Sequence, residues 1–152
     1  MFKKRKSIFE VEEGKLLSPK FDSKGLIPVI TTDYKSGEVL MHGYMNKIAF
    51  RKSIKTKEAH YWSRSRKALW HKGKTSGFVQ KIKDIRIDDD QDAVWLKVDI
   101  GNGASCHVGY KSCFYRSIPL GKSKSKKLKF EEKKKKFDPK KIYKDQPNPT
   151  KL

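Results

Sequence analysis

Residues 94–100 read Val-Trp-Leu-Lys-Val-Asp-Ile, and this stretch decides the fold class. Apolar residues occupy every second position from Val94 to Ile100, a period of two that is typical of a half-buried strand. Isoleucines at positions 82, 85 and 87 predict another strand just before it. The stretch therefore predicts a β-sheet at the centre of the molecule.

Further strands and turns are predicted on both sides of this stretch. Val39–Tyr44 has the apolar content of a strand, and Ala59–Trp62 has a strand-like composition. Three turn signals separate apolar runs in a way that favours hairpins. They are Asp22–Gly25, Ser36–Gly37 and Asn102–Gly103.

One segment has the pattern of a helix. Asn46 is a suitable N-cap, and the segment that follows it runs toward Lys57 with Ile48 and Ala49 at helical spacing. We therefore expect a β-rich α+β fold, with a mixed sheet or pseudobarrel and one main helix packed on it.

The 152 residues carry 37 basic and 17 acidic side chains, a formal charge of +20. This length suits one domain. The charge predicts attraction to anions, but it does not choose between nucleic acid, a membrane surface and phosphorylated metabolites. After Gly121 the chain is rich in lysine and has few apolar residues to fold around. Residues 122–152 are therefore predicted to be a solvated, disordered tail, with an RNA-binding or partner-binding arm as the alternative.

The sequence predicts a cytoplasmic protein without a membrane partner. No apolar run approaches the roughly 20 residues of a membrane span. Glu10, Glu12 and Glu13 stand where a secretory signal would be apolar. In a reducing compartment Cys106 and Cys113 are expected to be thiols or metal ligands rather than a disulfide.

An acidic cluster, Asp-Asp-Asp-Gln-Asp at residues 88–92, lies between the two central predicted strands. An extended backbone would place Asp88, Asp90 and Asp92 on one face. Three neighbouring carboxylates repel one another unless a cation neutralises them, and this favours a hard ion such as magnesium. An EF-hand loop is disfavoured because Ala93 stands where that loop requires glycine. The alternative is a solvated turn.

Two cysteines and a histidine follow the central strand, in the stretch Cys-His-Val-Gly-Tyr-Lys-Ser-Cys from Cys106 to Cys113. Thiolates and imidazole suit zinc, although this spacing matches no zinc knuckle and a cysteine is often just a small core residue. In a strand, His107 would point away from Cys106. An imidazole beside a metal ion suits general-base work, and the combination with the acidic cluster indicates a metal-dependent hydrolase.

Residues 60–77 interleave cations, hydroxyl groups and aromatic rings. Arginines beside serine and threonine hydroxyls can cradle a phosphate, and an aromatic face can stack a base. The same composition would serve single-stranded nucleic acid. An exposed basic hairpin with Trp62 and Trp70 facing the core is the purely structural alternative.

Taken in order, these segments resemble the phosphoribosyl-AMP cyclohydrolase family, which opens the purine ring of phosphoribosyl-AMP in histidine biosynthesis. The resemblance covers about residues 21–121. It implies an N-terminal extension over 1–20, a cyclohydrolase domain over 21–121 and the Lys-rich tail over 122–152. The matching stretches are Gly25–Val29, Gly37–Met41, Tyr44–Asn46, Glu58–Arg66, Leu69–Trp70, Lys72–Gly73, Thr75–Gly77, the acidic cluster and Ser105–Arg116.

The resemblance implies an intertwined homodimer whose two active sites form at the subunit interface and require zinc and magnesium. Asp88, Asp90 and Asp92 would bind magnesium. Cys106 and Cys113 would bind zinc together with a residue from the acidic cluster of the other subunit. Residues implied to hold the substrate are Trp62, Arg64, Ser65, Lys72, Thr75 and Ser76.

The chain departs from the family at the third zinc ligand, which is ordinarily a cysteine and here is Asp89. A carboxylate can bind zinc through oxygen, but more weakly than a thiolate. The departure is compatible with a weaker zinc site, with a different metal or with lost activity. A weaker zinc site is favoured because Asp89 keeps a metal-binding anion.

The implied reaction is hydrolytic attack at C6 of the adenine ring with zinc-activated water, followed by cleavage of the N1–C6 bond. His107 would move protons during the cleavage. The competing function is a nucleic-acid-binding module that uses residues 60–77 and the basic tail. The acidic cluster argues against that function because carboxylates repel phosphates.

Overall fold

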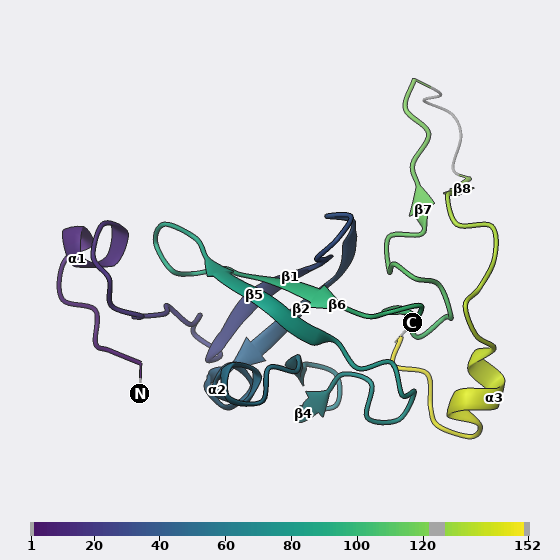
Figure 1. Ribbon diagram of the computed structural model, residues 1–152, viewed down its shortest axis with the longest axis horizontal. Helices are drawn as coiled ribbons and strands as arrows, with labels where there is room; N and C mark the ends of the chain where they lie inside the picture. Colours follow the sequence, from purple (N-terminus) through teal and green to yellow (C-terminus); the bar gives the residue numbers. More distant parts are fainter. Residues whose placement is uncertain (1, 122–126, 151–152) are drawn as a thin grey trace.

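The structure, a computed structural model, describes residues 2–121 and 127–150. Its centre is a four-stranded sheet in the order β2-β1-β6-β5 (Figure 1). β1 pairs with β2 and β5 pairs with β6 antiparallel, whereas β1 and β6 are parallel. The predicted mixed sheet is therefore confirmed, and its edges β2 and β5 leave it open rather than closed into a barrel. The strands are β1 (Leu26–Asp33), β2 (Val39–Asn46), β5 (Lys81–Ile87) and β6 (Val94–Asp99).

The two middle strands, β1 and β6, carry much of the core. Val94, Leu96 and Val98 are at most 1% exposed, whereas Trp95 between them is 36% exposed. This confirms the predicted alternation in β6. Val29 of β1 stands opposite Val94 in the parallel register and is fully buried. The core therefore lies against one face of the sheet.

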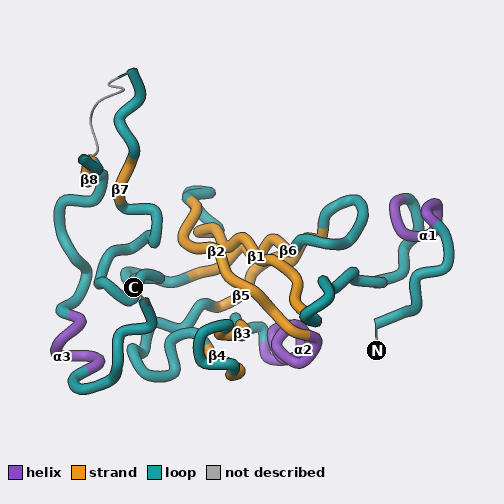
Figure 2. Tube along the Cα trace, turned by 180° about the vertical axis from the view of Figure 1, so that it is seen from behind, coloured by secondary structure: helices purple, strands orange, loops and turns teal. Residues whose placement is uncertain are grey.

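One face of the sheet is covered by α2 (Lys47–Thr56) and by a hairpin of β3 (His60–Ser63) and β4 (Ala68–His71), as both views show (Figures 1 and 2). The Asn46 side chain accepts a hydrogen bond from the Ala49 N–H at 2.8 Å, so Asn46 is the predicted N-cap. The helix ends at Lys57, whose backbone is left-handed. Ala49 and Phe50 bury the inner side of the helix in the core.

Only one of the three predicted hairpin turns joins paired strands. Ser36–Gly37 connects β1 to β2. Asp22–Gly25 comes directly before β1, where the Asp22 carboxylate accepts the N–H groups of Lys24 and Leu26. Asn102–Gly103 follows β6 and leads into a loop. The hairpin prediction is wrong for these two turns because the same turn residues also begin irregular loops.

Besides the main sheet, α2 and the β3–β4 hairpin, the described residues form four short elements, α1 (Ile8–Glu12), β7 (Arg116–Ser117), β8 (Lys129–Phe130) and α3 (Pro139–Tyr143). The first part of the predicted tail, residues 122–126, lies outside the described residues. Residues 127–150, named the C-terminal segment here, include β8 and α3 and contact the body of the protein. The boundaries at residues 20 and 121 stay a prediction. None of the helices in the described part of the chain has the length and apolar character needed to cross a bilayer.

A buried polar network ties the sheet, the hairpin and the loop after β6 together. The Tyr61 hydroxyl donates to Gln80 Oε1 at 2.7 Å and shares a 2.7 Å hydrogen bond with Thr31 Oγ1. Gln80 Nε2 donates to Ser105 Oγ at 2.9 Å. Burial raises the pKa of Tyr61 above its ordinary value, so the hydroxyl stays protonated and remains a donor. The network fixes the hairpin relative to the residue before Cys106.

Replacing Tyr61 with phenylalanine should lower the free energy of unfolding by about 1–3 kcal/mol, because Gln80 Oε1 loses its buried donor. The matched control is Tyr34→Phe, which removes a hydroxyl from a side chain that is 39% exposed and should stay within about 0.5 kcal/mol of wild type. Urea denaturation of the three proteins measures the difference. Equal losses in both variants would contradict the stabilising role of the network.

Candidate active site

A cavity of about 740 Å³ lies between the β3–β4 hairpin, the turn that follows it, the loop after β6 and the C-terminal segment. Tyr61 and Trp70 form part of its hairpin side. His107 and Cys113 line it from the loop after β6, named here the cysteine loop (residues 104–116). The cavity therefore gathers residues that are far apart in the sequence.

The lining of the cavity is strongly basic. Among the described residues, six lysines and arginines line the cavity, and no aspartate or glutamate does. Such a surface attracts anions, and low-dielectric walls strengthen the attraction. The six cationic residues are Arg64, Arg66, Lys72, Lys74, Lys140 and Lys144.

Aromatic rings hold several of these cations in place. The Arg64 guanidinium lies over the Tyr44 ring at 4.1 Å from its centroid. Arg66 and Lys72 lie 5.7 Å and 5.2 Å from the centroid of Trp70. Cation–π contacts of this kind restrict the long side chains. The same walls offer apolar faces on which a planar heterocycle can stack.

The structure brings most of the predicted substrate-binding residues together at this cavity. Five of the six line it, and Ser65, in the turn between β3 and β4, is not among the lining residues. The five are Trp62, Arg64, Lys72, Thr75 and Ser76.

The cysteine loop presents two free thiols that lie within hydrogen-bonding reach of each other. The hydrogen bond from Cys113 lowers the pKa of Cys106 to about 6, helped by the backbone N–H groups of Val108 and Tyr110. The same bond raises the pKa of Cys113. The two sulfur atoms form a donor set that suits a soft ion such as zinc.

Two cationic or titratable side chains lie beside the thiols. Lys72 is 3% exposed and is attracted electrostatically by Cys106 and Cys113, while burial lowers its own pKa. Burial also lowers the pKa of His107, and the nearby Lys72 charge adds to the effect. The His107 side chain is also hydrogen-bonded to Asn148 of the C-terminal segment, a contact that opposes this lowering, and the net effect favours the neutral ring at pH 7.

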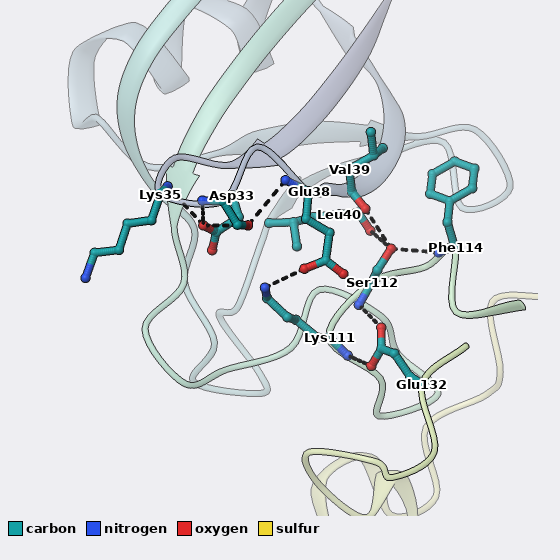
Figure 3. Close-up of polar contacts among 10 residues, drawn as sticks. Asp33, Lys35, Glu38, Val39, Leu40, Lys111, Ser112, Phe114 and Glu132 are labelled. Atoms are coloured by element: carbon teal, nitrogen blue, oxygen red, sulfur yellow. Dashed lines mark hydrogen bonds and ion pairs between the residues drawn. The ribbon is translucent and has the colours of Figure 1, made fainter. Parts of the chain in front are cut away.

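Backbone contacts hold the cysteine loop against β2. The Cys113 N–H donates to the Leu40 carbonyl at 2.7 Å. The Ser112 hydroxyl donates to the Val39 carbonyl at 2.7 Å (Figure 3). Lys111 forms an ion pair with Glu38, the residue directly before β2. The loop is thus fixed at the edge of the sheet.

The acidic cluster forms the turn between β5 and β6, named here the acidic turn (residues 88–92). Carboxylate oxygens of Asp88, Asp89 and Asp90 all lie within 4.8 Å of one another, an arrangement that can hold a metal ion. Asp88 accepts the N–H of Asp92 at 2.9 Å, and Asp92 instead pairs with Lys20 at 3.7 Å. These residues therefore form a turn between two strands, the alternative that the sequence also allowed, and their backbone is not extended.

Sequence reasoning missed the residue that anchors the acidic turn. Gln91 is 5% exposed and has a left-handed backbone with a φ of 58°. Its side chain accepts the Ser18 N–H at 2.7 Å and donates to the Val11 carbonyl at 2.9 Å. The N-terminal residues thereby fix the turn. An amide among four carboxylates was the available signal for this role.

The acidic turn and the cysteine loop lie at opposite ends of β6. In Figure 1 the acidic turn is on the side of α1, whereas the cysteine loop is on the side of α3. β6 alone spans about 20 Å at roughly 3.3 Å per residue. A single copy of the chain therefore cannot bring Asp89 to the two thiols.

The chain is similar to known proteins that share one name. The model of the family described as phosphoribosyl-AMP cyclohydrolase matches residues 41–115. The chain is 52% identical to the phosphoribosyl-AMP cyclohydrolase of Rhodopseudomonas palustris (strain TIE-1) over 134 residues, 88% of this chain and 89% of the relative. It is 48% identical to the protein of that name from Nitrobacter winogradskyi over 138 residues, 91% of this chain and 94% of the relative.

The similarity also extends beyond the region on which the sequence resemblance was based. Residues 21–121 together with residues 1–20 are too few to supply the 134 residues aligned with the Rhodopseudomonas protein, so the alignment includes part of residues 122–152. The predicted resemblance is confirmed, and the chain belongs to the phosphoribosyl-AMP cyclohydrolase family.

Proposed function

We propose that the protein hydrolyses the N1–C6 bond of phosphoribosyl-AMP and so opens its purine ring, a step of histidine biosynthesis. One observation carries the proposal: the cavity has six cationic and no acidic lining residues among those described, aromatic walls, and His107 and Cys113 at one side. Relatives that align with most of the chain bear the name of this enzyme.

The chemistry of this substrate matches the cavity. Phosphoribosyl-AMP carries a phosphate on each of its two riboses, with the purine between them. Cations from different elements of the chain can meet both phosphates, and the rings of Trp62 and Trp70 can pack on the purine. The volume of about 740 Å³ is within the range of small-molecule sites.

Zinc and magnesium fit the residues that are present. We propose that Cys106 and Cys113 hold zinc together with Asp89 of a second copy, and that Asp88, Asp90 and Asp92 hold magnesium. Asp92 would have to turn from Lys20 to join the other two. Bound zinc would lower the pKa of water so that hydroxide is available near neutral pH.

His107 has the properties of the proton carrier in this reaction. Its pKa is lowered by burial, so the neutral ring can accept the proton that water loses on attacking C6. The imidazolium can then deliver that proton to N1 as the N1–C6 bond breaks, and C6 becomes the carbon of a carboxamide. Arg64, Thr75 and Ser76 line the same cavity and are positioned to orient the ribose and phosphate groups.

The separation of the two proposed metal-binding groups supports a homodimer with shared active sites. Within one chain they lie at opposite ends of β6 (Figure 1). A second copy can place its acidic turn against the cysteine loop of the first, and a two-fold axis would then make two equivalent sites. The exposed side of the sheet, which includes Ile30 and Trp95, offers apolar surface for such contact.

The purified protein, stripped of metal by a chelator, should open the ring of phosphoribosyl-AMP only when zinc and magnesium are both restored. Ring opening changes the ultraviolet absorbance of the purine, and the rate of this change measures the activity. Activity with neither metal would contradict the metal assignment. Folded protein that is inactive under every combination would contradict the proposed function.

Replacing Asp89 with cysteine should tighten zinc binding by at least about tenfold, because a thiolate is a softer and stronger zinc ligand than a carboxylate. Competition with a chromophoric chelator measures the dissociation constant. The control is Glu12→Cys, which adds a thiol at an exposed position outside both metal-binding groups. If both variants bind zinc as the wild type does, Asp89 is not a zinc ligand.

A further inference from the structure

The C-terminal segment is docked on the cysteine loop through specific contacts. The Glu132 carboxylate accepts the backbone N–H groups of Lys111 and Ser112, both at 2.8 Å (Figure 3). The Lys136 N–H donates to the Gly109 carbonyl at 2.6 Å. At Gly109, with a φ of 104°, a Cβ atom would stand 2.5 Å from the Phe137 carbonyl oxygen. The two backbones therefore approach as closely as glycine allows.

Further along, the segment packs against the residues that follow the hairpin. The centroids of the Phe137 and Phe78 rings are 5.1 Å apart. The Tyr143 ring lies edge-on to Phe137, with their centroids 6.0 Å apart. The Tyr143 side chain is hydrogen-bonded to Ser76, and burial raises its pKa. These contacts seat α3 beside the cavity, and the chain then turns back toward the cysteine loop (Figure 1).

Residues of this segment form part of the lining of the cavity. Among them are Tyr143 and two of the six cations, Lys140 and Lys144. Lys140 lies in the first turn of α3, and Lys144 is the C-cap of the same helix, with a φ of 47°. Neither has a carboxylate partner in an ion pair within residues 2–121 and 127–150.

We propose that residues 139–150 are a wall of the substrate pocket, and that Lys140 and Lys144 bind one of the two phosphates of the substrate. The inference rests on the proposed function and names residues outside the 21–121 region to which the sequence resemblance pointed. The cations from the hairpin, Arg64 and Arg66, lie on a different element and are available to the other phosphate.

The alternative is that these lysines are ordinary solvated charges in a lysine-rich segment. The chain itself offers the comparison that separates the two cases. Lys133 and Lys134 belong to the same segment and are exposed, but they are not among the residues that line the cavity. Removing either pair changes the net charge equally, so a difference between the pairs reports on position rather than on charge.

The test compares Lys140→Ala/Lys144→Ala with Lys133→Ala/Lys134→Ala in the full chain. The first variant should raise KM for phosphoribosyl-AMP by about tenfold with kcat within about twofold of wild type, because charged hydrogen bonds to the phosphate are lost from bound substrate and transition state alike. The second should leave both constants within about twofold. Calorimetric titration with AMP and with ribose 5-phosphate, each without metal, shows which phosphate loses its partner.

Equal effects of the two variants would overturn the proposal, because they would show only a general charge effect. It would also be overturned if KM and the affinity for both probes are unchanged in the first variant. If the wild type does not open the ring, the proposed function fails and the titrations alone decide. Weaker binding of AMP or ribose 5-phosphate in the first variant alone would then support the proposal that residues 139–150 bind a phosphate. The proposal would be overturned if the wild type binds neither probe, or if the variants and the wild type bind them equally.

Discussion

The parallel pairing of β1 with β6 is the constraint on which the rest of the structure depends. It places β6 inside the sheet, buried through Val94, Leu96 and Val98, with its two ends at opposite sides of the molecule. The acidic turn precedes the strand and the cysteine loop follows it. The buried strand thus separates the carboxylates of the acidic turn from the two thiols of the cysteine loop. Asp88 and Asp89 of the acidic turn are exposed, whereas Cys106 is buried and Cys113 is exposed.

The cavity shows how the protein tolerates a concentration of positive charge. Arg64, Arg66 and Lys72 lie over aromatic rings, whose electron-rich faces partly offset the repulsion between cations. Cys113 and Cys106 attract the charge of the buried Lys72. No carboxylate among the described lining residues neutralises the remaining charge, so an anionic ligand gains the full attraction. A substrate with a phosphate at each end suits that balance.

Local patterns in the sequence predicted the elements well and their assembly less well. The alternation in β6 and the Asn46 cap of α2 are visible in the sequence because they depend on neighbours along the chain. The parallel register of β1 and β6 joins residues about 65 positions apart, and no local period encodes it. The acidic turn differs from the expected extended strand because the buried amide of Gln91 fastens it to the N-terminal residues.

The sequence predicted the part of the candidate site in which reactive and charged residues lie close together along the chain. It did not predict the part that forms when the C-terminal segment packs against the cysteine loop. Residue type and the family pattern identify several candidate residues in the sequence: the hairpin cations, His107 and the two cysteines. The contribution of the C-terminal segment does not stand out, because Glu132, Phe137 and Tyr143 are scattered among lysines that suggest a solvated tail. Only their contacts with Lys111, Phe78 and Ser76 reveal the docking.

The most direct test is subunit complementation between His107→Ala, which alters the cysteine loop, and Asp89→Ala, which alters the acidic turn. Each variant alone should have little ring-opening activity. Co-expressed in equal amounts, they should recover about one quarter of the wild-type activity, since half of the dimers are mixed and each mixed dimer has one intact site out of two. A mixture no more active than its parents would contradict active sites shared between two copies.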